Sequence, residues 1–435
     1  MNQLQLFLPC AAGVEGFLAD EVHTAIGLTG DDLLVGRGGV LLRASWRQAM
    51  QLNLHSRLAQ RVLVQLAQGQ YRSENDLYAL ASSIAWEIWF TPKQSFKVEV
   101  TAQHSPLTSL NFAALRVKDA VADRFRAKKG VRPDVDTAWP DVRVHLHLTT
   151  DEATVYIDTS GEALFKRGWR NVKEGGAKGD APLKETLAAA MIAASGWDPH
   201  GEAPLPLYDP CCGSGTVLIE AAQMACRIAP GLQRHFAFEK LLPFQSHVWD
   251  AIKNEAVSAV QTSATAIFGS DISHRMVDFA QHNAERAGVG HALQLRGGDA
   301  LQRMPPCEQP GVMLLNPPYG ERIAAAGAAG QNARERADQR AHGEAVGRET
   351  AQTSDSAEGG EFFLQLAAHW KKNYTGWEAW MLTPDLKLPG KMRLKESRRV
   401  PMWNGPIECR LFRFDMIRGS LRSKPGAASA PAHGA

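Results

Sequence analysis

The chain has 435 residues, of which 44% are hydrophobic and 22% charged, with a formal net charge of +2. These proportions are typical of a soluble globular protein, and the length exceeds a single hydrophobic core, so two or three domains are expected. The net charge neither supports nor excludes a nucleic-acid partner, because the distribution of charge says more than its sum.

The cysteines and the apolar runs exclude several classes of protein. Six cysteines occur without a C-x-x-C pair, so neither a zinc site nor a disulfide framework is indicated, and no metal is expected. No charged segment followed by an apolar one opens the chain, and no apolar run approaches ~18 residues. We therefore expect a cytoplasmic protein without a membrane partner.

Residues 1–65 alternate short strands and helices. Apolar runs at 4–8 and 39–42 predict strands, and a 3.6-residue apolar pattern predicts a helix over 14–26. A second helix is expected over 45–53, followed by a strand at 61–66. This alternation predicts a small α+β domain.

Residues 66–160 repeat that alternation and carry an excess of positive charge. The expected elements are helices at 76–88 and 109–126 and strands at 95–101, 142–148 and 154–158. Between Arg37 and Arg132 there are fifteen lysines and arginines against six acidic residues. Many of the cations lie on the helix at 109–126 and its exit, where the helix dipole also favours them. A phosphate-binding edge and a solvated helix surface are both compatible with this pattern.

Residues 161–185 connect the two halves of the chain, and they are not a plain linker. A cluster from Leu164 to Arg170 combines aromatic and basic side chains, which a flexible Gly/Ser linker lacks. Gly-rich residues and the run Ala181-Pro182-Leu183-Lys184-Glu185 follow. We interpret the connector as the lip of a ligand site in the next domain.

The second half, residues 186–418, begins with a strand at 205–208 that leads into a glycine-rich turn. Gly213 and Gly215 let the backbone approach a ligand closely, and the following helix places its N-terminus at the same point. The turn is not a dinucleotide fingerprint, because Leu218 stands where the third glycine of G-x-G-x-x-G belongs. A nicotinamide-dependent oxidoreductase is disfavoured for that reason.

Three further predicted strands also end in polar residues. Strands at 266–269, 293–296 and 312–315 are followed by Asp271, Asp299 and Asn316, respectively. In an open α/β sheet the carboxyl ends of parallel strands share one edge, which is where ligands bind. An acid at the tip of the second strand suits a ribose diol, and Asp299 is placed to accept a hydrogen bond from an adenine amino group. Four polar strand ends in succession are more specific than any one of them.

The fourth of these strands ends in Asn316-Pro317-Pro318-Tyr319. The two prolines hold the backbone extended and remove two N–H donors, which leaves the Pro317 carbonyl available to a ligand. With the Asn316 side-chain carbonyl and the flat face of Tyr319, the motif is suited to holding a planar base by its exocyclic amino group. A simple strand-ending turn is the alternative.

The remaining residues complete the predicted domain. Residues 324–360 are rich in Ala, Gly, Arg, Glu and Gln and predict a disordered insertion, and residues 419–435 predict a flexible tail. Between them we expect a helix at 361–372 and a strand at 377–382. A hairpin over 398–416 is expected to turn at Asn404-Gly405, the strongest short hairpin signal.

Three motifs resemble those of class I S-adenosylmethionine-dependent methyltransferases, and more narrowly of the bacterial guanine-N2 methyltransferases of 23S ribosomal RNA. They are the glycine-rich turn at 209–216, the strand end Gly269-Ser270-Asp271-Ile272, and Asn316-Pro317-Pro318-Tyr319-Gly320-Glu321-Arg322. The connector and the hairpin turn also look like segments of that family. The resemblance implies a ferredoxin-like subdomain at 1–65 and a THUMP RNA-binding domain at 66–160. It also implies a Rossmann-like α/β methyltransferase domain that ends in the antiparallel hairpin.

The resemblance also implies roles for individual residues, with S-adenosylmethionine as cofactor. Base-holding roles are expected of Asn316, Pro317 and Tyr319. Cofactor contacts are expected of Asp209, Gly213, Gly215, Thr216, Asp271, Ile272, Asp299 and Ala300. RNA contacts are expected of Arg116, Arg124, Arg126, Lys128, Lys129, Arg167 and Arg170.

The expected reaction is therefore methylation of a guanine N2 in 23S ribosomal RNA or in a ribosome-assembly intermediate. Other planar –NH2 groups stay open as targets, namely guanine N2 of tRNA, adenine N6 and a glutamine side-chain amide. A non-catalytic RNA-binding assembly factor that only holds the cofactor is the alternative from another class of function. It is disfavoured because the Asn-Pro-Pro-Tyr motif and the acidic strand ends are intact.

Overall fold

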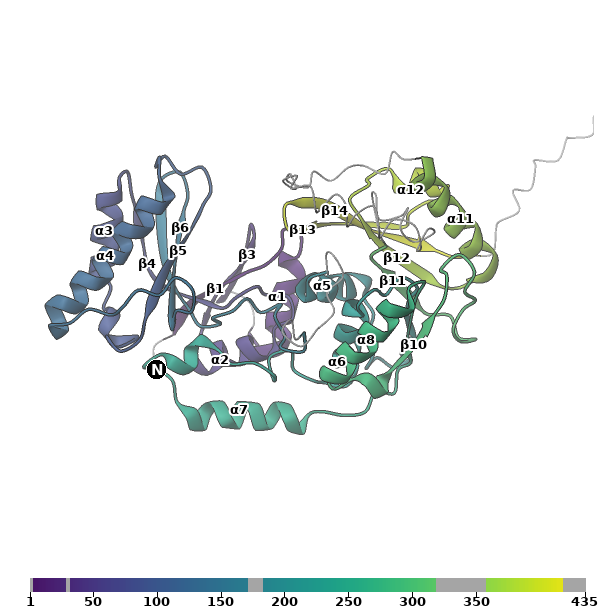
Figure 1. Ribbon diagram of the computed structural model, residues 1–435, viewed down its shortest axis with the longest axis horizontal. Coiled ribbons are helices and arrows are strands. Elements are labelled where there is room, and N and C mark those ends of the chain that lie inside the picture. The colour runs from purple at the N-terminus through teal and green to yellow at the C-terminus, as the bar shows by residue number, and fades with distance from the viewer. Residues whose placement is uncertain (1–2, 29–31, 171–182, 318–356, 418–435) are drawn as a thin grey trace, which may run out of the picture.

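The structure is a computed structural model that describes residues 3–28, 32–170, 183–317 and 357–417. Two seven-stranded sheets organise the chain, one in each half (Figure 1). No helix within the described ranges is long and apolar enough to span a membrane. Tyr319, the predicted tail and most of the predicted insertion lie outside these ranges.

The first sheet has the strand order β2-β3-β1-β4-β7-β6-β5. Its strands are β1 (Leu4–Pro9), β2 (Leu33–Gly36), β3 (Gly39–Ala44), β4 (Leu63–Gln70), β5 (Phe96–Ala102), β6 (Val142–Leu148) and β7 (Glu152–Asp158). Only β5 and β6 are parallel to each other. Strand β4 pairs with β1 through Leu63 and Val64 and with β7 along its whole length. The predicted boundary between residues 65 and 66 therefore falls inside a strand that two domains share.

Four α-helices accompany this sheet, namely α1 (Glu15–Ile26), α2 (Trp46–His55), α3 (Glu74–Ser83) and α4 (Leu110–Lys129). Helix α2 begins with a capping box in which Ser45 Oγ accepts from the Gln48 amide and Gln48 Oε1 accepts from the Ser45 amide. Helix α4 runs three residues beyond the predicted end. It stops at Gly130, whose φ of 76° suits a residue without a Cβ.

The predicted helix at 76–88 is wrong in its last turn. Helix α3 ends at Ser83, and the chain turns through Ile84 into a short 3₁₀ helix, η2 (Trp86–Ile88). The break lets the Trp86 indole reach the core, where it is fully buried and donates a hydrogen bond to the Ala81 carbonyl at 2.8 Å. Burying that side chain offsets the loss of a continuous helix.

The second sheet has the strand order β10-β9-β8-β11-β12-β14-β13. Its strands are β8 (Leu207–Asp209), β9 (Ile267–Asp271), β10 (Leu293–Gly297), β11 (Val312–Leu315), β12 (Glu378–Thr383), β13 (Arg398–Asn404) and β14 (Ile407–Asp415). The first five strands in this order are parallel, and β14 and β13 continue the sheet as an antiparallel hairpin. The Rossmann-like sheet with a C-terminal hairpin is thus confirmed.

Helices cover both faces of this sheet. They are α5 (Glu185–Ser195), α6 (Thr216–Ala225), α8 (His274–Arg286), α11 (Ala357–Asn373) and α12 (Leu388–Met392), with the short 3₁₀ helix η4 (Gly290–Ala292) before β10. Helix α7 (Ser246–Ser258) and the 3₁₀ helix η3 (Ala237–Lys240) instead pack against the N-terminal half, where α7 contacts α2 and the Phe238 amide donates to the Thr159 carbonyl. Strand β11 shows the layering, because Val312 and Leu314 join the same apolar cluster as α5 and α6. Met313 and Leu315 point the other way, into a second cluster with α11. Figure 1 shows α5, α6 and α8 together on one side and α11 and α12 on the other.

The N-terminal half packs tightly against the second sheet. A Cβ added at Gly13 would lie 2.2 Å from the Pro401 carbonyl oxygen of β13, and one at Gly231 would lie 2.9 Å from the Leu54 carbonyl oxygen. The Gly231 amide donates to that same carbonyl at 3.0 Å. One apolar cluster runs continuously from β1 to β14. The two halves are therefore joined by a packed interface rather than by the connector alone.

Candidate active site

The glycine-rich turn between β8 and α6 has a shape that only glycine permits. Gly213 and Gly215 have φ values of 52° and 84°, in the left-handed region. A Cβ on Gly215 would lie 3.0 Å from the Cβ of Ala280 on α8. The turn is fixed from outside by Asn283, whose amide nitrogen donates to the Ser214 carbonyl at 3.0 Å. The backbone is thereby held open towards the carboxyl edge of the sheet.

Leu218, which breaks the dinucleotide pattern, has a definite place in the packing. It lies on α6 over β9, and a Cβ added at Gly269 would come within 2.2 Å of its Cδ1 atom. The close approach of helix to strand is thus provided by a glycine on the strand instead of on the helix. The signal was present in the sequence as Gly269, in the middle of an apolar strand.

Asp209 ends β8 and is 2% exposed. Its Oδ1 atom accepts a hydrogen bond from the Cys211 amide at 2.9 Å, and no basic side chain among the described residues pairs with it. The pKa of Asp209 is raised to about 8, mainly by burial and also by the nearby charge of Asp271, while the hydrogen bond from the Cys211 amide opposes the rise. The carboxyl group is therefore held where a cationic ligand would stabilise its ionised form.

Asp271 ends β9 and is held by backbone amides. Its carboxylate accepts hydrogen bonds from the amides of Gly213 and Ser273, both at 2.9 Å. Burial raises the pKa of Asp271, and the two amide hydrogen bonds oppose that effect. The first bond connects the tip of β9 to the glycine-rich turn, so the two predicted cofactor-binding segments meet in the structure.

The end of β10 lies beside the end of β9. The Gly298 amide donates to the Asp271 carbonyl at 2.9 Å. Asp299 is half-buried and accepts from the Leu301 amide at 2.9 Å. Ala300 is buried, whereas Ile272 is 46% exposed, an aliphatic side chain at the rim of this edge. All the predicted cofactor-binding residues therefore lie along one edge of the sheet.

The two cysteines of the glycine-rich turn do not offer a nucleophile. Burial and the charges of Asp209 and Asp271 raise the pKa values of Cys211 and Cys212 well above the usual thiol range. Both thiols stay protonated at neutral pH, whereas nucleophilic cysteines require a lowered pKa. Covalent catalysis through either thiol does not fit this site.

Asn316 and Pro317 follow β11 at the same edge. Leu315, the last residue of β11, pairs with Met381 of β12. Asn316 is then half-buried and Pro317 buried, between the ends of β8 and β12 in the strand order. The structure therefore places these two predicted base-holding residues beside the acidic strand ends.

A nucleoside-type cofactor fits the edge formed by these residues. The left-handed glycines leave the turn without side chains facing the ligand, the carboxylates of Asp271 and Asp299 suit ribose and amino groups, and Ile272 offers an apolar surface. Within the described residues, no group of three or more His, Cys, Asp or Glu side chains could hold a metal ion.

The predicted RNA contact by Arg167 is wrong. Arg167 is 3% exposed, and its Nε atom lies 3.0 Å from Oε1 of the fully buried Glu220 on α6. Arg57, from the N-terminal half, reaches the other oxygen of the same carboxylate at 3.2 Å. We call this set of three residues the junction triad. The signal for it was an acid within the apolar run of α6, since a buried charge requires partners.

Arg170 is also used inside the protein rather than at a surface. Its Nε atom lies 2.7 Å from Glu185 Oε1, and its guanidinium donates to Thr216 Oγ1 and lies over the Trp169 ring. Burial lowers the pKa of Arg170, while the Glu185 carboxylate opposes that effect. Arg170 therefore connects the first turns of α5 and α6 beside the glycine-rich turn, and the predicted RNA contact does not fit it.

The predicted RNA contacts on α4 fall into two groups. Arg124 forms two hydrogen bonds with Glu87, and Arg116 lies over the Tyr78 ring and donates to Asn75. Arg126 is exposed, and among the described residues its one ion-pair partner is Asp123, one turn away. Lys128 and Lys129 are exposed and form no ion pair with any described residue. The last turn of α4 is thus the part of the helix that presents positive charge to solvent.

Comparison with known families matches three consecutive parts of the chain. Residues 5–63 match the RlmL ferredoxin-like domain, residues 71–158 match the THUMP domain, and residues 167–342 match the RMKL-like methyltransferase domain.

Curated relatives match nearly the whole chain. The chain is 34% identical over 432 residues to the ribosomal RNA large subunit methyltransferase K/L of Psychromonas ingrahamii, and 36% identical over 421 residues to that of Shewanella amazonensis. These matches cover 98% and 96% of this chain but 52% and 54% of the relatives. The chain thus spans about half the length of the curated relatives it matches.

Solved structures with the same arrangement of elements include a putative methyltransferase, SMU.472, complexed with SAH. It is 26% identical with a TM-score of 0.78, and the match covers 95% of this chain and 98% of that one. A possible methylase from Clostridium difficile 630 is also 26% identical, with a TM-score of 0.77 and the same coverage of both chains. The chain therefore has the class I methyltransferase fold, and it combines an RlmL-type ferredoxin-like domain, a THUMP domain and an RMKL-like methyltransferase domain.

Proposed function

We propose that the chain methylates the exocyclic N2 of a guanine in large-subunit (23S) ribosomal RNA, with S-adenosylmethionine as methyl donor. The observation that carries this proposal is the meeting of Asn316-Pro317 with Asp209, Asp271 and Asp299 at one sheet edge. The names of the curated relatives support ribosomal RNA as substrate, and the SAH complex of a structural neighbour supports the cofactor.

The acidic edge would hold the cofactor. The carboxylate of Asp271, fixed by the Gly213 and Ser273 amides, is positioned to accept hydrogen bonds from a ribose diol. Asp299 would accept from the adenine amino group, and Ile272 would cover the adenine ring. When bound, S-adenosylmethionine supplies an electrophilic methyl group on a positively charged sulfur.

Asn316 and Pro317 would prepare the nucleophile. The lone pair of an exocyclic guanine nitrogen is delocalised into the ring, so the nitrogen is a weak nucleophile. Hydrogen bonds from its two hydrogens to the Asn316 side-chain carbonyl and the Pro317 backbone carbonyl would draw it towards tetrahedral geometry. The acceleration then comes from positioning and electrostatics in a site fixed by the sheet.

The N-terminal half would supply the RNA. A base inside a structured RNA must be unstacked before it reaches an enzyme site, which costs a few kcal/mol. Exposed cations such as Lys128 and Lys129 suit contacts to phosphates, which would offset that cost. The packed interface between the halves would hold such contacts at a fixed distance from the catalytic edge.

The test is methyl transfer from labelled S-adenosylmethionine to 23S ribosomal RNA that lacks the modification, followed by mass spectrometry of the nucleosides. We expect N2-methylguanosine with the wild-type chain. Asn316→Ala should lower the rate at least ~100-fold, the range for removing one preorganised polar contact to a transition state. Its dissociation constant for SAH should stay within about twofold, because Asn316 is assigned to the base.

Asn254→Ala, an exposed asparagine on α7, is the matched control and should leave the rate unchanged. Retention of full activity by Asn316→Ala would contradict the role of the motif. Appearance of N6-methyladenosine instead of N2-methylguanosine would contradict the assigned base.

A further inference from the structure

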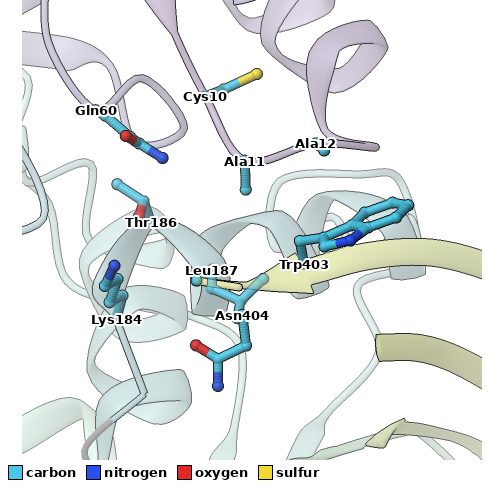
Figure 2. A pocket seen from close by; sticks show the side chains of 10 residues that line it. Cys10, Ala11, Ala12, Gln60, Lys184, Thr186, Leu187, Trp403 and Asn404 are labelled. Atoms are coloured by element: carbon cyan, nitrogen blue, oxygen red, sulfur yellow. The ribbon is translucent and has the colours of Figure 1, made fainter. Parts of the chain in front are cut away.

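A pocket of about 210 Å³ lies at the junction of three parts of the chain (Figure 2). The segment after β1, with Gln60 before β4, forms one wall from the ferredoxin-like domain. Lys184, Thr186 and Leu187, at the start of α5, form the second wall. The third wall is Trp403 and Asn404 at the hairpin turn. Occupation of the pocket would therefore involve both halves of the molecule at once.

The side chains around this junction pocket suit an anion next to a flat ring. Lys184 is exposed, lies over the Phe165 ring and forms no ion pair with any described residue. None of the described residues that line the pocket is acidic. Thr186 is 8% exposed and adds a hydroxyl group to the lining of the pocket. The first turn of α5 adds the positive end of a helix dipole.

Two side-chain amides and an indole also line the pocket, and these groups suit contacts to a nucleotide base. Figure 2 labels the side-chain amides of Gln60 and Asn404 and the Trp403 indole around the pocket. Aromatic faces stack on any base, and amides offer both a donor and an acceptor to a base edge. Cation, hydroxyl, amides and indole together match the phosphate, sugar and base of one nucleotide.

The junction pocket lies on the same side of the second sheet as the catalytic edge. Thr383, the last residue of β12, pairs with Arg410 of β14. The hairpin turn lies at Gly405-Pro406, one residue later than predicted, because Asn404 still pairs with Ile407. It therefore extends past the carboxyl ends of the parallel strands, where Asn316 also lies. With strands ~4.8 Å apart and ~3.4 Å per residue, the turn is about 15–20 Å from Asn316. A few nucleotides of an extended strand span that distance.

We propose that the junction pocket binds one unstacked nucleotide of the RNA substrate, a few positions away from the methylated base. Its volume of about 210 Å³ is below the ~300–1,000 Å³ of pockets that enclose drug-sized ligands, so it encloses only part of one nucleotide and excludes a duplex. Trp403 stacks on the base and Lys184 contacts the phosphate. The nucleotide holds the strand at a fixed distance from Asn316 and so helps to keep the target base extruded.

This inference rests on the proposed RNA methyltransferase function, and two measurements on the full chain separate the failures of the two proposals. The first is photo-crosslinking to an oligoribonucleotide of eight residues that contains 4-thiouridine, which needs no methyl transfer. Trypsin releases residues 400–410 as one peptide, with Trp403 and Asn404 in it. We expect a crosslink to that peptide.

The second measurement is the kinetics of methyl transfer to 23S ribosomal RNA. Trp403→Ala should raise the KM for RNA about tenfold, within the range for loss of one stacked base, with kcat within about twofold. Trp403→Phe should recover most of the loss. Lys184→Gln should reduce the slope of log affinity against log salt by about 1, as for one lost phosphate contact. The dissociation constant for SAH should be unchanged in all three variants, which also shows that they fold.

Lys372→Gln, an exposed lysine at the end of α11, is the matched control and should behave as wild type. Crosslinks confined to peptides of α4, or an unchanged KM and salt slope in the Trp403 and Lys184 variants, would overturn the proposal. If the wild-type chain transfers no methyl group to RNA, the proposed function fails. Whether the junction pocket binds a nucleotide is then decided by the crosslink and by the salt dependence of oligonucleotide binding.

Discussion

Buried acids occur both at the carboxyl edge of the second sheet and in the junction triad, but they differ in whether basic side chains pair with them. At the edge, Asp209 and Asp271 are held by backbone amides and have no basic partner among the described residues. At the junction, Glu220 is enclosed by two arginines from different parts of the chain. The acid that joins the two halves is thus neutralised by arginines, whereas the two acids at the carboxyl edge have no counter-ion among the described residues.

This difference distinguishes a buried acid that binds a ligand from one that stabilises the fold. An acid whose pKa is raised by burial stores free energy that a cationic ligand can recover, which is the usual condition of functional sites. A buried acid with two arginine partners has already recovered its Coulomb energy, so its role is to fix the geometry of the junction. Substituting one acid of each kind tests whether the two differ in this way.

The largest effect on stability is expected from Glu220→Ala. The substitution leaves Arg57 and Arg167, with side chains 12% and 1% exposed, as buried cations without their partner. Removing one member of a buried ion pair typically costs about 3–5 kcal/mol. Denaturant-induced unfolding of the full chain should show a loss of that size.

Glu255→Ala is the control, because Glu255 pairs with Arg47 at the surface, with side chains 71% and 47% exposed. An exposed pair contributes at most about 1 kcal/mol. Equal losses for the two variants would show that the junction triad contributes no more than a surface pair does.

An effect of comparable size is expected from Asp209→Asn, but it appears in the pH dependence of stability. The pKa of Asp209 is about 8 in the folded chain, above its ordinary value near 4, so the folded state binds more protons than the unfolded state between these pH values. Stability without ligand should therefore fall as pH rises from about 4 to 8, and this group contributes up to ~1.4 kcal/mol per pH unit.

The comparison of thermal unfolding between pH 5 and 8 checks this expectation. The asparagine variant has no carboxyl group to ionise, so its midpoint should depend less on pH than that of the wild type. Identical slopes in the two proteins would mean that Asp209 stays ionised without cost. The raised pKa would then not mark the carboxyl edge as a ligand site.

The carboxyl edge could be predicted from the sequence to a large extent. Each of its residues follows directly on a short apolar strand, and parallel strands bring their ends together whatever the packing of the rest. Asp209, Asp271, Asp299 and Asn316 therefore needed only local signals to be placed side by side. To place Leu218, one further signal was needed, namely Gly269 on β9, whose missing side chain leaves room for that of Leu218.

The junction could not be predicted in the same way. Arg57, Arg167 and Glu220 are separated by more than fifty residues from one another, and a basic aromatic cluster such as 164–170 has the same composition whether it faces RNA or a buried carboxylate. The shared strand β4 was missed for a similar reason. A strand pattern does not say which of its residues pair with β1 and which with β7.

The smallest effect is expected from a comparison of an exposed with a paired cation on helix α4, which extends the contrast to the N-terminal half. Lys128→Gln should weaken binding to 23S ribosomal RNA roughly threefold at physiological salt and lower the salt slope by about 1, because one phosphate contact is lost. Arg124→Gln, on the same helix, should leave the slope unchanged, since its charge is already bound to Glu87. Fluorescence anisotropy at several salt concentrations measures both. A slope change for Arg124→Gln equal to that for Lys128→Gln would mean that the ion pair opens to meet RNA. Internal pairing would then no longer distinguish structural cations from RNA-binding ones in this half.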